Sequence, residues 1–271
     1  MSDAELLEAM IEAAIEAGRA VQEIYETNSW RGLEVRTKAD SSPVTLADRT
    51  SEAIVLEHLA RCARAIPVIA EEEVAAGRVP EFGAEFFLVD PLDGTKEFIA
   101  RRGEFTVNIA LVRGGAPVLG VVLCPPVGKL YAGNCAARAA FRSELDGERA
   151  SVPPRVSIRV RPVPSAGVTA VASRSHASRE TDEYLGRYRV AERISIGSSL
   201  KFCLIAEGRA DLYPRLGQTM EWDTAAGHAV LLAAGGLVTT AQGEALGYGK
   251  PQFRNPWFIA SGALAPQPIE A

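Results

Sequence analysis

A hexapeptide about one third of the way along the chain carries the strongest chemical signal in the sequence. Its residues, Asp-Pro-Leu-Asp-Gly-Thr at positions 90 to 95, follow the apolar run Phe86 to Val89. This pattern predicts a buried strand that delivers two carboxylates, a tight turn and a hydroxyl group to the start of a helix. Carboxylates bind hard cations, and a helix N-terminus binds phosphate. Because carboxylates alone would repel a phosphate, the combination favours a phosphate bound through metal ions.

Two other acidic segments stand at comparable places. Glu71 to Glu73 end a predicted strand, and Asp223, after Trp222, stands at the start of a predicted helix. Each segment has an ordinary alternative: the glutamates are compatible with a solvated surface run, Asp223 with a helix cap, and the hexapeptide with a plain turn. Three acidic strand ends or helix starts on one chain nevertheless favour a metal site. A parallel pairing of the two strands would bring their acids together.

The candidate ligands indicate magnesium rather than zinc. They are carboxylates, with a main-chain carbonyl as a further candidate, and His58, His176 and His228 show no shared ligand spacing. The sequence contains no GxxxxGK[ST], GxGxxG or GxSxG pattern, which argues against a P-loop enzyme, a dinucleotide-binding enzyme and a serine hydrolase.

Helices and a run of antiparallel strands are expected to position these residues in the first half of the chain. A capping box at Ser2 and Glu5 begins one helix, and a second is expected from Leu46 to Ala63 with Thr45 as its cap. Gly114 and Gly115 predict a hairpin turn. Strands are expected at 67–70, 86–89, 105–109, 116–123, 130–131 and 139–141.

The second half alternates strands with helices. Strands are expected at 168–172, 193–196, 210–213, 237–240 and 257–260, and helices at 179–188, 200–207 and 224–234. The polar stretch Ser143 to Pro154 separates the two halves. We therefore expect an N-terminal α+β domain, residues 1–150, with most of the metal ligands, and a C-terminal α/β domain, residues 151–271, with Asp223 and the residues that determine substrate specificity.

Composition excludes several classes of protein. The 271 residues are 47% hydrophobic and carry a net charge of −5, so the chain lacks the basic character of a nucleic-acid binder and no polymeric partner is expected. Four cysteines without CxxC spacing predict reduced thiols in the cytoplasm. No stretch is long and apolar enough to predict a membrane span, and the first residues lack the features of a signal peptide.

The acidic motifs resemble those of a known superfamily. Glu71-Glu72, the hexapeptide and Trp222-Asp223 are similar to the motifs of the lithium-sensitive, magnesium-dependent phosphatases, which include inositol monophosphatases and fructose-1,6-bisphosphatase. Longer stretches, 93–99, 172–177, 195–203 and 222–229, resemble the bacterial 3'(2'),5'-bisphosphate nucleotidase branch. The resemblance covers almost the whole chain and implies a layered αβαβα sandwich of the α/β class.

The resemblance also implies an activity. It is the hydrolysis of adenosine 3',5'-bisphosphate to AMP and phosphate in support of sulfate assimilation, with 3'-phosphoadenosine 5'-phosphosulfate as a further substrate and with inhibition by lithium. Inositol monophosphate is the alternative substrate, and a sensor of nucleotide or metal without turnover is an alternative of another class. A monomer or a homodimer, and a peripheral position on the cytoplasmic face of the inner membrane, are both compatible with the resemblance.

Roles for individual residues follow from the same resemblance. Thr95, oriented by Asp48, would position the attacking water. A third consecutive acid, Glu73, leaves open whether Glu71 or Glu72 is the ligand, although Glu71 aligns best. The implied ligands of two or three Mg²⁺ ions are Glu71, Asp90, the Leu92 carbonyl, Asp93 and Asp223.

A bisphosphate needs two anion sites. The backbone N–H groups of Gly94 and Thr95 are expected to hold the phosphate that is cleaved. The second phosphate needs its own cations away from the metals, and the candidates are Lys201, Arg174 and His176, with Ser198 as a hydroxyl donor. The ordinary alternative for these three cations is surface charge. Glu221, beside Trp222, is an unusual acid at its position and is expected to alter the local charge.

Overall fold

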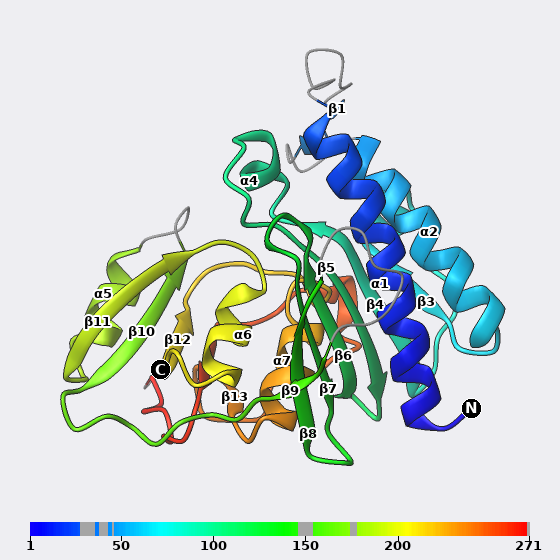
Figure 1. Ribbon diagram of the computed structural model, residues 1–271. Helices are drawn as coiled ribbons and strands as arrows, with labels where there is room; N and C mark the ends of the chain where they lie inside the picture. The colour runs from blue at the N-terminus through cyan, green and yellow to red at the C-terminus, as the bar shows by residue number, and fades with distance from the viewer. Residues whose placement is uncertain (28–35, 38–42, 45, 146–153, 174–177, 270–271) are drawn as a thin grey trace.

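The protein is a stack of five layers, with helices and sheets alternating (Figure 1). The computed structural model describes residues 1–27, 36–37, 43–44, 46–145, 154–173 and 178–269. A seven-stranded sheet and a five-stranded sheet form two of the layers, and a short two-stranded sheet pairs β1 (Arg36–Thr37) with β2 (Pro43–Val44). The expected αβαβα sandwich is confirmed.

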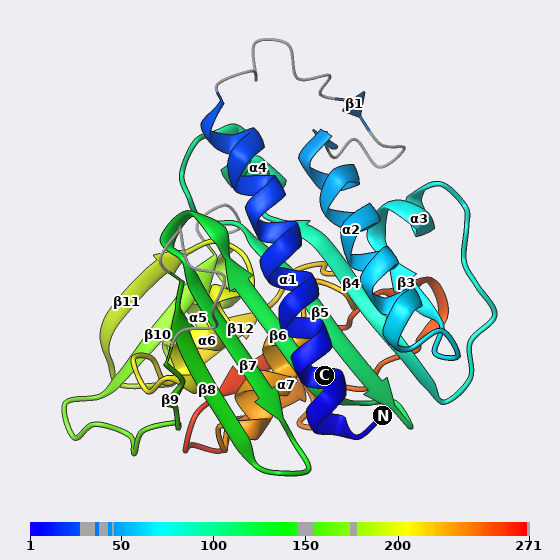
Figure 2. The same ribbon diagram turned by 45° about the vertical axis from the view of Figure 1, so that its right-hand side comes forward.

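Two long helices form the first layer. The helices α1 (Asp3–Glu26) and α2 (Leu46–Cys62) lie side by side on one face of the larger sheet (Figure 2). The capping box that begins α1 is confirmed, because Ser2 Oγ accepts a hydrogen bond from the Glu5 N–H while the Glu5 carboxylate accepts one from the Ser2 N–H. The expected cap of α2, Thr45, lies outside the described residues.

The seven-stranded sheet has the order β3-β4-β5-β6-β7-β8-β9. Only β3 and β4 pair in parallel, and every other neighbouring pair is antiparallel, as expected. Both glycines of the predicted hairpin between β5 and β6 have positive φ angles. The strands are β3 (Val68–Ala70), β4 (Glu85–Asp93), β5 (Thr106–Arg113), β6 (Ala116–Cys124), β7 (Lys129–Asn134), β8 (Ala139–Glu144) and β9 (Val156–Ser157).

Two apolar helices separate the sheets. The helices α6 (Leu200–Ala206) and α7 (Ala225–Ala233) lie between the larger sheet and the smaller one (Figure 1). The helix α7 lies very close to β6 and β7, because a Cβ atom added at Gly120 would stand 2.3 Å from the carbonyl oxygen of Ala226. Glycine is therefore required at this contact.

The smaller sheet has the order β11-β10-β12-β14-β13, and α5 (Arg179–Leu185) contacts β12 in that sheet. Its strands are β10 (Val168–Ser173), β11 (Val190–Ile196), β12 (Leu212–Arg215), β13 (Leu237–Thr240) and β14 (Phe258–Ser261). Short helical turns elsewhere are α3 (Glu71–Ala75), α4 (Thr95–Ile99) and two 3₁₀ turns, Pro125–Val127 and Pro251–Phe253.

The two halves of the chain share one core. The largest hydrophobic cluster contains Ile69 and Phe86 from the first half together with Val171 and Phe202 from the second. The strand β9, which follows the expected domain boundary, pairs with β8 of the larger sheet. The boundary itself falls in residues 146–153, outside the described part of the chain.

Candidate active site

The acidic ends of two neighbouring strands lie side by side. The strands β3 and β4 are parallel, and Ala70 pairs with Val89, so the next residues, Glu71 and Asp90, leave the same edge of the sheet. The helix α3 begins at Glu71, and β4 continues through an irregularity between Asp90 and Asp93 before α4 begins. The parallel pairing predicted from the sequence is therefore confirmed, and β4 extends four residues beyond its expected end at Val89.

The hexapeptide adopts a tightly fixed turn. Gly94 has a φ angle of 97°, which only glycine adopts easily, and it forms the N-cap of α4. The Leu92 N–H donates to Asp90 Oδ1 at 3.0 Å, and Ser51 Oγ donates to the Pro91 carbonyl oxygen at 2.7 Å. These bonds hold the two aspartates of the turn in a defined relation to α2.

Thr95 and Asp48 form the expected pair. The distance from Thr95 Oγ1 to Asp48 Oδ1 is 3.1 Å, and the carbonyl oxygen of Leu92 lies 3.3 Å from the same hydroxyl group. A hydroxyl group has one proton, and the Asp48 carboxylate, which is buried, is the stronger acceptor for it. The lone pairs of Thr95 Oγ1 then remain available to accept a hydrogen bond from a water molecule.

A series of hydrogen bonds joins Asp93, on the larger sheet, to Asp223, which lies just before α7 between the sheets. The side-chain amide of Asn108, on β5, donates to Asp93 Oδ2 at 3.4 Å and to Ser199 Oγ at 3.0 Å. Ser199 Oγ donates in turn to the backbone carbonyl oxygen of Asp223 at 2.7 Å. The structure therefore brings Asp223 to the end of β4 that carries the hexapeptide.

The pKa shifts show that these carboxyl groups converge. Burial raises the pKa of Asp93, and the ammonium group of Lys201 lowers it in part. Burial raises the pKa of Asp223 well above its ordinary value, and the charges of Asp93 and Glu71 raise that pKa further. Asp93 and Glu71 are thus each close enough to Asp223 for their charges to act on its carboxyl group.

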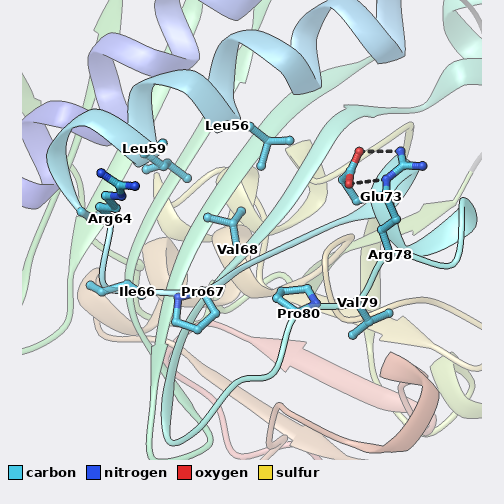
Figure 3. Close-up of a pocket in the computed structure, with 12 residues that line it drawn as sticks. Leu56, Leu59, Arg64, Ile66, Pro67, Val68, Glu73, Arg78, Val79 and Pro80 are labelled. Carbon is cyan, nitrogen blue, oxygen red and sulfur yellow. Dashed lines mark hydrogen bonds and ion pairs between the residues drawn. The ribbon is translucent and has the colours of Figure 1, made fainter.

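The three consecutive glutamates have different surroundings. Arg78 binds both carboxylate oxygens of Glu73, at 2.7 and 2.6 Å, and this pair lines an apolar cavity of about 570 Å³ beside α2 and β3 (Figure 3). The N–H of Glu72 donates to Glu52 Oε2 at 2.8 Å, and Glu71 is the glutamate whose charge reaches Asp223. These contacts favour Glu71 as the one that faces the other acids.

Lys201 lies close to the candidate metal ligands Asp93 and Asp223. Its side chain is buried, and Nζ donates to the carbonyl oxygen of Ser198 at 2.5 Å. Burial lowers the pKa of Lys201 to about 8, while the charges of Asp93, Glu97 and Asp223 act against that shift. Lys201 thus lies closer to the candidate metal ligand Asp93 than expected, because α6 begins beside Ser199, which hydrogen-bonds to Asn108 and to the Asp223 backbone.

Ser198 and Arg215 leave buried polar atoms without partners in the described part of the chain. These atoms are Ser198 Oγ and Arg215 Nε. The Arg215 side chain is buried at the end of β12, where Nη2 donates to the Gln218 carbonyl oxygen at 3.0 Å, and its charge acts on both Lys201 and Asp223. A second buried cation therefore stands beside Lys201.

Some functional residues were not found by sequence reasoning. Arg215, Asn108 and Glu52 contact the site, and sequence analysis singles out none of them. The available signal for Arg215 was a charged residue two positions after the strand predicted at 210–213. Two of the proposed substrate contacts, Arg174 and His176, lie outside the described residues.

The unusual acid Glu221 binds the backbone of the loop at Gly249 and Lys250. Its buried carboxylate accepts hydrogen bonds from the N–H groups of Gly249 and Lys250, at 2.7 and 2.9 Å, and forms an ion pair with Lys250 Nζ at 2.7 Å. The ammonium group of Lys250 therefore balances the charge of Glu221.

The donor set fits a hard cation. In the described part of the chain, no group of three or more histidine, cysteine, aspartate or glutamate side chains forms a ready-made metal cage. The converging groups are nevertheless all oxygen donors, and burial raises the pKa of Asp93 and of Asp223, so their ionised forms need a counter-charge. A divalent cation with oxygen ligands would supply that counter-charge.

Comparison with known proteins places this chain in one family. The model of the inositol monophosphatase family matches residues 2–267. The chain belongs to this family, whose members are generally metal-dependent.

Individual relatives are similar over nearly the whole chain. The 3'(2'),5'-bisphosphate nucleotidase CysQ of Shigella flexneri is 44% identical over 94% of this chain and 99% of that protein. The protein of the same name from Escherichia coli K12 is 43% identical with the same coverage. The crystal structure of CysQ from Bacteroides thetaiotaomicron matches with a TM-score of 0.79 and 38% identity, over 96% of this chain and 98% of that one.

Among the described residues, no helix has the length and apolar character that crossing a bilayer requires.

Proposed function

We propose that this protein is a magnesium-dependent phosphomonoesterase that removes the 3'-phosphate of adenosine 3',5'-bisphosphate to give AMP and phosphate. The observation that carries the proposal is the convergence of Asp223 with Glu71 and Asp93 beside the Thr95–Asp48 pair. The similarity to proteins named 3'(2'),5'-bisphosphate nucleotidase supports the choice of substrate. We include 3'-phosphoadenosine 5'-phosphosulfate as a second substrate and a role in sulfate assimilation.

Five residues of the site would hold two or three Mg²⁺ ions. When bound, these ions would activate water and stabilise the negative charge of the leaving ribose oxygen. The first half of the chain would supply most of the ligands and the second half would supply Asp223, in line with the proposed division at residue 150. The ligands are Glu71, Asp90, the Leu92 carbonyl, Asp93 and Asp223.

Thr95 would position the attacking water. Because the Thr95 hydroxyl group donates its hydrogen bond to Asp48, Thr95 Oγ1 would accept a hydrogen bond from the water and direct the lone pair of the water oxygen toward phosphorus. The backbone N–H groups of Gly94 and Thr95, at the start of α4, would hold the oxygens of the phosphate that is cleaved.

The second phosphate would meet two cations of the C-terminal half. Lys201 and Arg215 lie close enough for their charges to interact, and Ser198 Oγ is a buried hydroxyl group without a partner in the described part of the chain. Two adjacent cations fit a second phosphate group better than the neutral ring of an inositol. Arg174 and His176 remain proposed as further contacts.

Phosphate release measured side by side tests this choice. With Mg²⁺ present, we expect the specificity constant for adenosine 3',5'-bisphosphate to exceed that for inositol 1-phosphate by at least about 100-fold, the value of two or more charged hydrogen bonds. A preference for the inositol ester would replace the proposal by the inositol monophosphatase alternative. Binding of the nucleotide without phosphate release would indicate a sensor, which the Thr95–Asp48 pair argues against.

Location and assembly are part of the proposal. We propose a cytoplasmic enzyme, because all four cysteines are free thiols. It acts as a monomer or a homodimer on a small-molecule nucleotide, is inhibited by lithium, and associates at most peripherally with the cytoplasmic face of the inner membrane.

A further inference from the structure

The short helix α3, which carries Glu71, lacks a cap of its own. Its N-cap residue, Ala70, has no side chain that can accept a hydrogen bond. The carboxylate of Glu52, on α2, supplies the missing acceptor, because Glu52 Oε2 lies 2.8 Å from the backbone nitrogen of Glu72. The side chain of Glu52 is buried, so water does not provide an easy substitute.

Glu52 belongs to one polar face of α2 that contacts both the hexapeptide and α3. Asp48 holds the hydroxyl group of Thr95, Ser51 holds the carbonyl oxygen of Pro91, and Glu52 holds the first turn of α3. Positions three and four residues apart lie on the same face of a helix. The three side chains are buried, although the inner face of an amphipathic helix is ordinarily apolar.

The other side of α3 is also held. Glu73 is bound by Arg78 through both carboxylate oxygens beside the apolar cavity, as Figure 3 shows. Glu52 therefore holds α3 at Glu72, and Arg78 holds it at Glu73, two residues beyond Glu71.

A buried carboxylate at this cap costs free energy, because burial and the neighbouring acids disfavour its charged form. Burial raises the pKa of Glu52 to about 7, and the charges of Glu72, Glu73 and Glu71 contribute to that shift. A neutral acceptor such as glutamine would avoid the repulsion. The contact with α3 uses the length of the side chain and one acceptor oxygen, Oε2.

We propose that Glu52 is a positioning residue for the candidate metal ligand Glu71. Its carboxylate fixes the N-terminus of α3 and so directs the Glu71 carboxylate toward Asp223. The inference rests on the proposed function, because it takes Glu71 as a ligand of the metal.

Metal binding without substrate tests the proposal. Mn²⁺ is titrated into the metal-free protein and followed by the loss of its free electron paramagnetic resonance signal. We expect Glu52→Ala to weaken Mn²⁺ binding about 10- to 100-fold, as removal of a supporting contact does, and Glu52→Gln, which retains one acceptor oxygen, to weaken it less than about 5-fold. Glu57→Ala, on the exposed side of α2, is the matched control and should leave Mn²⁺ binding unchanged.

Amide hydrogen exchange provides the second readout. The Glu72 amide should exchange at least about 5-fold faster in Glu52→Ala than in the unmodified protein, because it loses its acceptor, whereas amides in β5 should not change. Unchanged Mn²⁺ affinity in a folded Glu52→Ala, or equal losses in the glutamine and alanine variants, would overturn the proposal. If Glu52→Ala does not fold, Glu52→Asp replaces it, since the shorter side chain cannot keep the 2.8 Å contact.

These readouts separate the two proposals. Neither Mn²⁺ binding nor amide exchange requires turnover. If the protein releases no phosphate from any nucleotide while Glu52→Ala still weakens Mn²⁺ binding, the proposed substrate is wrong and the role of Glu52 stands. If phosphate is released and Mn²⁺ binding is unaffected, the role of Glu52 is wrong and the activity stands.

Discussion

Asn108 and Ser199 are separated by 91 positions in the sequence and are joined by a hydrogen bond of 3.0 Å. Asn108 lies on β5 of the larger sheet, and Ser199 immediately precedes α6 between the sheets. Asn108 also contacts the Asp93 carboxylate, and Ser199 contacts the backbone of Asp223. This one bond therefore sets the separation of two acids that come from different halves of the chain.

The first prediction concerns that bond. Asn108→Ala should reduce kcat/KM about 10- to 100-fold, because Asp223 loses its fixed distance from Asp93. The free energy of unfolding should fall by about 1–3 kcal/mol, the cost of leaving a buried partner unsatisfied. Steady-state kinetics and urea unfolding measure the two effects. Asn134→Ala, which removes a contact to Ala137 in the β7–β8 hairpin, is the control and should not change kcat/KM. Wild-type kcat/KM in Asn108→Ala would show that the bond does not position the acids.

The second prediction concerns the charge of Asp93. Asp93→Asn should abolish turnover, by more than about 100-fold, because it removes a candidate metal ligand and not only a supporting contact. The fold should persist, since the amide preserves the shape of the side chain and relieves the repulsion that raises the pKa of Asp223. Phosphate release and circular dichroism measure both properties. Unchanged turnover would show that Asp93 does not hold a metal ion that the reaction needs.

Local patterns predicted much of the fold. The alternation at residues 105–109, the β-rich stretch 116–123 and the glycine pair between them gave the hairpin of β5 and β6 correctly, and the capping box gave the start of α1. The strand β9 was missed because it has two residues and both are exposed, so it carries no hydrophobic signal. The predicted helix at 179–188 ends at Leu185, where Gly186 forms the C-cap.

Only the motifs of the site were predicted from the sequence. Acids that follow strands were visible in the sequence, and the parallel pairing of β3 with β4 brings two of those segments together as expected. The contacts that hold them were not visible. Glu52, Asn108 and Arg215 act through partners that the fold brings close, and residue spacing along a helix or strand does not specify a partner on another element.

The third prediction concerns the two buried cations. Lys201→Ala should raise KM for adenosine 3',5'-bisphosphate about 10- to 100-fold, the value of one charged hydrogen bond, and should raise KM for 3'-AMP less. The reason is that 3'-AMP lacks the second phosphate. Kinetics with both substrates measure the difference, with Lys129→Ala on β7 as the control. Equal increases for the two substrates would show that Lys201 does not recognise the second phosphate.

The last prediction concerns stability at acid pH. Burial, with a contribution from the charge of Lys250, lowers the pKa of His228 to about 3. Its Nδ1 lies 2.9 Å from the hydroxyl group of Tyr248, which lies 3.2 Å from Thr224 Oγ1. If Tyr248 donates to Thr224, the neutral histidine donates to Tyr248 through Nδ1–H.

Because the folded-state pKa of His228 is below the unfolded value of about 6.5, only the unfolded chain takes up a proton as the pH falls below 6.5. His228 should therefore cost about 2 kcal/mol of stability between pH 7 and pH 5. Urea unfolding at the two pH values measures this loss. In His228→Gln, which cannot be protonated, the loss should be smaller by that amount, whereas His58→Gln, on α2 where His58 contacts Glu16, serves as the control. An identical pH dependence in His228→Gln and the unmodified protein would show that His228 is protonated in the folded state near its ordinary pKa.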